Sequence, residues 1–205
     1  KFVCFLFFLS CAPVLERAEH LPQGKWEIAR GIGFSGIGIG GELDIKYGLL
    51  DVTEIGGGGS MSMVLIGGVM VDGYLQAKQK IFAYQDFSLS LFGRYGRTYF
   101  FFLEETYPYY LVDVLVGKRI GGIYVTIGGG VLYYPPYFIT IYAVEGGGPP
   151  LDEPEPLFHG FCSFFRYPLY LTVVGARDRE GNYISMCIGI GFSLILPSHS
   201  KVEKQ

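Results

Sequence analysis

The stretch GIGFSGIGIGGELDIKYGLLDVTEIGG, Gly31–Gly57, alternates bulky apolar residues with glycine or charged residues. Within Ile37–Tyr47 the odd positions are apolar apart from Gly41, whereas the even positions of Gly36–Lys46 are small or charged. A two-residue period places these two sets on opposite faces of a β-strand. A helix would need apolar residues three and four positions apart, and each glycine would cost it about 1 kcal/mol. The pattern therefore predicts a strand.

The same alternation recurs along most of the chain. Its clearest examples are Trp26–Phe34, Phe87–Gly96, Tyr110–Arg119, Ile123–Tyr134 and Ile184–Leu196, and weaker ones are Val52–Ser60, Val69–Lys78, Phe158–Arg166 and Leu169–Ala176. Together they predict about ten strands of roughly nine to eleven residues, the length of a tilted strand that crosses a bilayer. Arg30 interrupts the apolar face of its strand, which predicts either a β-bulge or a side chain that snorkels to an interface.

The chemistry of the two faces indicates which one meets lipid. The chain is 50% hydrophobic and only 17% charged, whereas ordinary soluble domains carry about 25% charged residues. A soluble barrel would need large solvated side chains outside, yet the second face here is mostly glycine, serine and alanine. We therefore expect an all-β fold, a transmembrane antiparallel up-and-down β-barrel of about ten strands (range eight to twelve). Its expected extent is residues 25–196.

Short turn signals alternate with two longer connections. The turns are expected at Gly48–Asp51, Ile120–Gly122, Tyr167–Leu169 and Asp178–Asn182, and the longer connections at Thr98–Pro108 and Tyr134–Pro156. The first long connection carries an apolar patch that we expect to rest on the outer leaflet or to dock an apolar solute or partner: Tyr99, Phe100, Phe101 and Phe102. Ile120–Val144 is uncharged and long enough for a transmembrane helix, but Pro135, Pro136 and the alternation favour a strand.

The N-terminal residues KFVCFLFFLSCAP are typical of an export signal. We expect residues 1–10 to be a signal peptide and Cys11 to be lipidated, because Phe8–Cys11 resembles a bacterial lipobox. A plain secretory signal is the alternative. Residues 11–24 would then be a lipidated tether, and residues 197–205 a polar tail. Apart from this covalent lipid, no cofactor is expected.

Two groups of side chains are candidate functional residues. The first is a network of charges facing the lumen, formed by Glu27, Glu42, Asp44, Lys46, Asp72, Arg94, Asp113 and Arg119. Mixed charges in a narrow lumen should pair, so we expect a structural plug in which Arg94 and Arg119 hold inward carboxylates such as Asp44, Asp72 and Asp113. A polar path for a small solute is the alternative. The second is an aromatic belt at the strand ends, formed by Trp26, Tyr47, Tyr95, Tyr110, Tyr133 and Tyr183.

The segments LPQGKWEIARGIG, YGLLDVTEIG and CIGIGFSLIL resemble outer-membrane β-barrel proteins of Gram-negative-type bacteria, including lipid-modified ones. The resemblance covers most of the mature chain at the level of class. It implies an outer-membrane location, and the bilayer and the outer-membrane assembly machinery as partners. The end PSHSKVEKQ departs from the terminal aromatic residue that such proteins often carry.

Other functions find weaker support. A secreted soluble barrel that binds a small apolar ligand is one alternative, and a membrane-embedded acyl hydrolase is another. Hydrolysis would need Ser163 beside His159, but four residues along one strand separate them by about 13 Å. We therefore expect no enzyme activity. No metal site is expected from the four cysteines, which lack metal-ligand spacing, and no basic excess points to nucleic acid.

Overall fold

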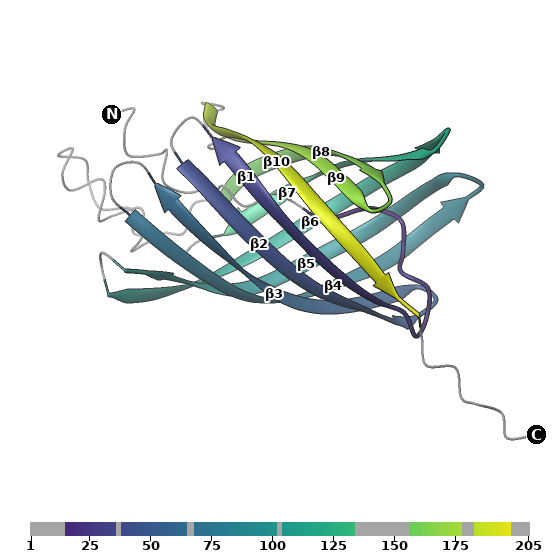
Figure 1. Ribbon diagram of the computed structural model, residues 1–205, viewed down its shortest axis with the longest axis horizontal. Helices are drawn as coiled ribbons and strands as arrows, with labels where there is room; N and C mark the ends of the chain where they lie inside the picture. Colours follow the sequence, from purple (N-terminus) through teal and green to yellow (C-terminus); the bar gives the residue numbers. More distant parts are fainter. Residues whose placement is uncertain are drawn as a thin grey trace, which may run out of the picture.

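The computed structural model describes residues 15–35, 38–64, 68–101, 104–133, 156–177 and 183–197. Ten antiparallel strands form a closed up-and-down barrel, in which each strand pairs with its chain neighbours and β1 pairs with β10 (Figure 1). The strands are β1 (Trp26–Ser35), β2 (Gly38–Leu50), β3 (Thr53–Val64), β4 (Gly68–Tyr84), β5 (Phe87–Phe100), β6 (Glu105–Ile120), β7 (Ile123–Tyr133), β8 (Pro156–Arg166), β9 (Leu169–Arg177) and β10 (Tyr183–Leu196). The predicted fold class is confirmed.

One rim of the barrel, the turn rim, carries two-residue turns. They join β2 to β3, β4 to β5, β6 to β7 and β8 to β9, and Trp26 pairs with Leu196 at the same rim. Gly121 adopts a φ of +60° in the β6–β7 turn, a conformation that a side chain would strain. The opposite end, the loop rim, carries the remaining connections.

One sequence expectation changes at the level of the strands, and another is confirmed. Thr98–Phe100 continues β5 and Glu105–Pro108 begins β6, so most of the predicted Thr98–Pro108 connection is paired strand. The two-residue alternation persists there, because Thr98 is buried in the lumen while Arg97 faces outward. Within Ile120–Val144, where the sequence favoured a strand over a transmembrane helix, Ile123–Tyr133 forms strand β7. Among the described residues, no helix is long and apolar enough to cross a membrane.

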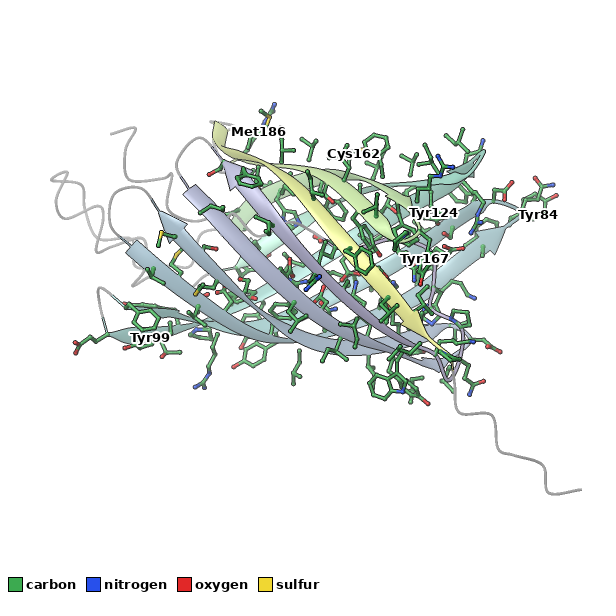
Figure 2. The ribbon with its side chains drawn as sticks, in the orientation of Figure 1. Tyr84, Tyr99, Tyr124, Cys162, Tyr167 and Met186 are labelled. Atoms are coloured by element: carbon green, nitrogen blue, oxygen red, sulfur yellow. The ribbon has the colours of Figure 1, made fainter. Side chains whose placement is uncertain are left out.

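The outward face of the barrel is apolar and the inward face is small or polar. On β10, Ile190 is 57% exposed whereas Ser193 is fully buried, and side chains project from the outside of the strands all around (Figure 2). An exterior of exposed isoleucine, leucine, valine and phenylalanine with a polar interior is the arrangement of a transmembrane barrel. It does not suit a soluble barrel that holds an apolar ligand inside.

Aromatic side chains gather toward both ends of the exterior. Trp26 and Tyr47 contact each other at the turn rim, with ring centroids 4.6 Å apart and the ring planes tilted by 38°. Tyr95, Tyr110 and Tyr133 lie in register on β5, β6 and β7, nearer the loop rim. Tyr84 and Tyr99 mark opposite ends of the molecule in Figure 2. The predicted aromatic belt therefore has five of its residues on the exterior toward the two rims, and the side chain of Tyr183 lies outside the described residues.

The two cysteines of the strands face opposite sides of the barrel wall. Cys162 on β8 is half-buried on the exterior, whereas Cys187 on β10 is buried in the lumen. A disulfide between them is therefore absent.

Candidate functional site: a lumen filled by the N-terminal segment

Residues 15–24 form the N-terminal segment, which runs inside the barrel as far as Leu21 and leaves it at the turn rim, where Pro22 and Gln23 are exposed. They were predicted as part of a tether, but Leu15, Ala18 and Leu21 are fully buried. The purple trace of this segment can be followed inside the ring of strands to the turn rim, where it enters β1 (Figure 1). Its apolar side chains pack on lumen-facing residues, which provides the contacts that a free tether would lack.

The barrel wall hydrogen-bonds the backbone of the N-terminal segment. Lys46 Nζ donates to the Leu15 carbonyl at 2.7 Å, and Lys78 Nζ donates to the Arg17 carbonyl at 3.1 Å. The other contacts of this kind are Ala18 N–H to Thr126 Oγ1, Ser90 Oγ to the Ala18 carbonyl, and Leu21 N–H to Glu54 Oε2. Buried backbone groups need partners, so wall side chains do here what a neighbouring strand would otherwise do.

Ion pairs reinforce these backbone contacts. Glu16 lies 2.8 Å from Lys46, and Arg17 donates to Glu27 at 3.1 Å while its guanidinium stacks over Phe165. All of these charged groups are almost fully buried. A buried charge without a partner is costly, so the segment and the wall complete each other's electrostatics.

Two glycines make room for the N-terminal segment. A Cβ at Gly48 on β2 would clash with the Pro22 carbonyl, and a Cβ at Gly191 on β10 would clash with the Leu15 side chain. The glycine-rich inner face noted in the sequence is therefore filled partly by chain from outside the sheet. Side-chain volume alone does not close this lumen.

A second cluster lies on β2, β4 and β5. The central carbon of the Arg94 guanidinium lies 3.8 Å from the centroid of the Tyr74 ring, and Arg94 Nη2 lies 3.0 Å from Glu42 Oε1. The Tyr74 hydroxyl bonds both Glu42, at 2.5 Å, and Asp44. Arg94 therefore holds inward carboxylates, as the sequence predicted.

The predicted partners of Asp72 and Asp113 were wrong. Asp72 accepts hydrogen bonds from Ser60 and Thr98, whereas Asp113 on β6 lies 2.9 Å from His159 Nε2 on β8. The latter pair reaches across β7 at Gly130, which is in register with both residues, and a Cβ there would clash with Asp113. The sequence signal that could have identified this pair is that Asp113, Gly130 and His159 all lie on the lumen-facing side of three consecutive strands.

Arg119 leaves the lumen network for the turn rim. Its side chain is half-exposed and pairs with Glu19 of the N-terminal segment at 2.7 Å. Cavities of about 350 Å³ and 440 Å³ flank this pair, and both are lined by Glu19, His20, Arg119 and Tyr124. The segment thus leaves space on two sides at the mouth of the barrel.

His20 also belongs to this mouth. Its Nε2 lies 3.1 Å from the Leu50 carbonyl, and its Nδ1 lies 4.0 Å from Glu54. Burial lowers the pKa of His20 below its usual value; Glu54 opposes this shift and Lys78 adds to it. The neutral imidazole is thus the favoured form when the segment is docked.

The remaining predicted residues are placed as follows. Tyr99 and Phe101 make an edge-to-face contact at 5.0 Å beside the loop rim. Phe102 and Cys11 lie outside the described residues, as does the side chain of Phe100. Ser163 and His159, considered above as a catalytic pair for hydrolysis, do not contact each other. His159 contacts Asp113, and Ser163 contacts Thr172.

The barrel is similar in architecture to known membrane barrels. No protein-family model matches the chain, and no curated protein matches it. An outer-membrane channel from Pseudomonas putida F1 is 10% identical with a TM-score of 0.48, covering 87% of this chain and 98% of the channel. The KdgM porin in complex with disordered oligogalacturonate is 12% identical with a TM-score of 0.42, covering 82% and 97%. A de novo designed transmembrane β-barrel is 11% identical with a TM-score of 0.36, covering 87% and 100%. These similarities concern the barrel architecture and assign no substrate.

Proposed function

We propose that this chain is an outer-membrane β-barrel that forms a closed channel, with residues 15–24 as its plug. The observation that carries the proposal is the polar docking of this segment inside the lumen. Its wall contacts come from strands around the barrel, including β2, β4, β5 and β7. Bacterial outer-membrane barrels have short turns at one end and longer loops at the other, an apolar outer band and a polar interior, as here.

The docking contacts are of a kind that water can replace. The Lys46, Lys78, Ser90 and Thr126 side chains would remain solvated if the segment left, because the wall they line is polar. A lumen sealed permanently would instead favour apolar packing, since buried ion pairs add little net stability. The polar wall therefore suits a path that opens.

The wall charges favour cations. The described strands carry six buried inward carboxylates and three inward cations, namely Glu27, Glu42, Asp44, Glu54, Asp72 and Asp113 against Lys46, Lys78 and Arg94. Rings of carboxylates select cations in pores. Ten strands enclose far less space than the sixteen or so of an aqueous porin, so the solutes are small.

Planar-bilayer recording tests the proposal. We expect the full chain to show little steady conductance, and a variant lacking residues 15–22 to conduct with a preference for K⁺ over Cl⁻. Ala18→Asp is a second variant, because Ala18 is fully buried and a carboxylate there should expel the segment. A band that shifts on boiling in a denaturing gel confirms that each variant is folded.

The outcomes separate the parts of the proposal. Large, stable channels from the full chain would overturn the plug. Silence from both folded variants would overturn the channel and leave a structural barrel. A preference for Cl⁻ over K⁺ would contradict only the proposed charge of the solute, and not the channel or its plug.

A further inference from the structure

Arg30 places a positive charge on the lipid-facing surface. It lies on β1 between Ile28 and Ile32, with Leu43 of β2 and Phe192 of β10 directly beside it in register. Arg30 is exposed, as are Leu43 (48%) and Phe192 (40%). Its surroundings on the exterior are therefore apolar.

No irregularity of the strand turns Arg30 away from the lipid. The register of β1 with β2 and with β10 runs unbroken from Trp26 to Ser35. The β-bulge that was one of the two explanations predicted for Arg30 is absent. The Arg30 side chain must therefore reach a polar region along the surface.

The nearest polar region is the headgroup layer at the turn rim. Arg30 lies four residues from Trp26, which corresponds to about 10 Å of depth for a strand tilted by about 40°. A long arginine side chain can cover most of this depth by snorkelling. An arginine with no partner at the bilayer midplane would cost about 2–4 kcal/mol.

The counter-charge must come from outside this chain's lipid-facing belt. Among the described side chains, the exposed carboxylates are Asp51, Asp86 and Glu104, all in connections at the rims. The described strands of a second copy would therefore offer no carboxylate at this depth. A lipid phosphate does, and a guanidinium binds phosphate through paired hydrogen bonds.

We propose that Arg30 binds the phosphate of an anionic phospholipid in the leaflet at the turn rim. The acyl chains of this lipid lie along Ile32 and Ile190, neighbours on β1 and β10. Trp26, on the same face of β1, lies beside the headgroup. The site is independent of whether the lumen conducts.

Trp26 is the single tryptophan of the chain, so its fluorescence reports on this site. The folded protein would be placed in phosphatidylcholine vesicles with a minor fraction of phosphatidylglycerol, with brominated chains on one lipid at a time. At equal mole fraction, we expect brominated phosphatidylglycerol to quench Trp26 as if enriched about fivefold. Brominated diacylglycerol, which lacks a phosphate, should show no enrichment, and added inorganic phosphate should not compete.

Variants make the test specific. Arg30→Gln should reduce the enrichment to about one, and Arg30→Lys should keep part of it. Arg97→Gln is the matched control, because Arg97 is an exposed outward arginine on β5 toward the loop rim. Equal quenching by both lipids in the unsubstituted protein, or enrichment that survives in Arg30→Gln, would overturn the proposal. The measurement of equal quenching uses only the unsubstituted protein, so it does not depend on whether a variant folds.

Discussion

Arg119 Nη2 on β6 lies 2.7 Å from Oε1 of Glu19 on the N-terminal segment. This ion pair bridges the segment and the wall at the turn rim, between the two cavities. Both side chains are partly exposed, so the pair contributes no more than about 1 kcal/mol to stability. Its position, rather than its strength, makes it a candidate latch.

Removal of the latch should loosen the segment and leave the barrel intact. For Arg119→Ala we expect unchanged resistance to boiling in denaturing gels, and brief conductance events that are rarer in the unsubstituted protein. Lys118→Ala is the control, because Lys118 is the adjacent residue and faces the exterior. The exchange Glu19→Arg with Arg119→Glu should restore closure; persistent opening in this double variant would contradict the latch.

Docking of the segment should weaken as the pH falls. Burial lowers the pKa of His20 in the folded protein, so below the unfolded value of about 6.5 the undocked state binds more protons. The stabilisation by neutral His20 is therefore complete above that pH and is lost as the pH falls toward the lowered pKa. Conductance recorded from pH 7.5 to 5 should rise, and His20→Gln should remove most of the change. An identical pH profile in His20→Gln would exclude His20 as the cause.

Gly130 should not tolerate a side chain. In Gly130→Ala the new Cβ would clash with the Val112 carbonyl and with Asp113, which should cost about 1–3 kcal/mol. Urea unfolding in lipid vesicles measures the loss. Gly160→Ala on β8 is the control, since its Cβ would meet only the Gly128 carbonyl at 3.7 Å, an ordinary contact. Equal stability of the two variants would show that the Asp113–His159 pair does not depend on this space.

The two faces of β10 should respond differently to polar substitutions. Ile190 is 57% exposed to lipid, so Ile190→Arg should cost about 2–4 kcal/mol if it lies near the midplane. Gly189→Ser places a small hydroxyl in the lumen and should cost much less. The same urea titration measures both, and equal losses would contradict the assigned facing.

The strands were predictable because lipid and lumen impose opposite chemistry on alternate residues. Ile190 and Ser193 were assigned to the correct faces by parity alone. The ion-pair partners were harder, because pairing depends on register: Asp113 meets His159 only when β6, β7 and β8 align at Gly130. Docking of residues 15–24 was missed, because proline and charge in a segment before the first strand are equally typical of a free tether.

Lipidation of Cys11 stays a prediction, and the position of Leu15 gives it a testable consequence for docking of the N-terminal segment. Leu15 is fully buried beside Lys46 in the lumen, and four extended residues span at most about 14 Å. A lipid on Cys11 must lie in a leaflet, so acylation should compete with docking of the segment. We expect the intact mass of the membrane-extracted protein to show an acylated chain beginning at Cys11, and this form to conduct more than an enzymatically delipidated one. An unmodified mature N-terminus would leave a plain secretory signal, and equal, low conductance of the two forms would show that the lipid and the docked segment coexist.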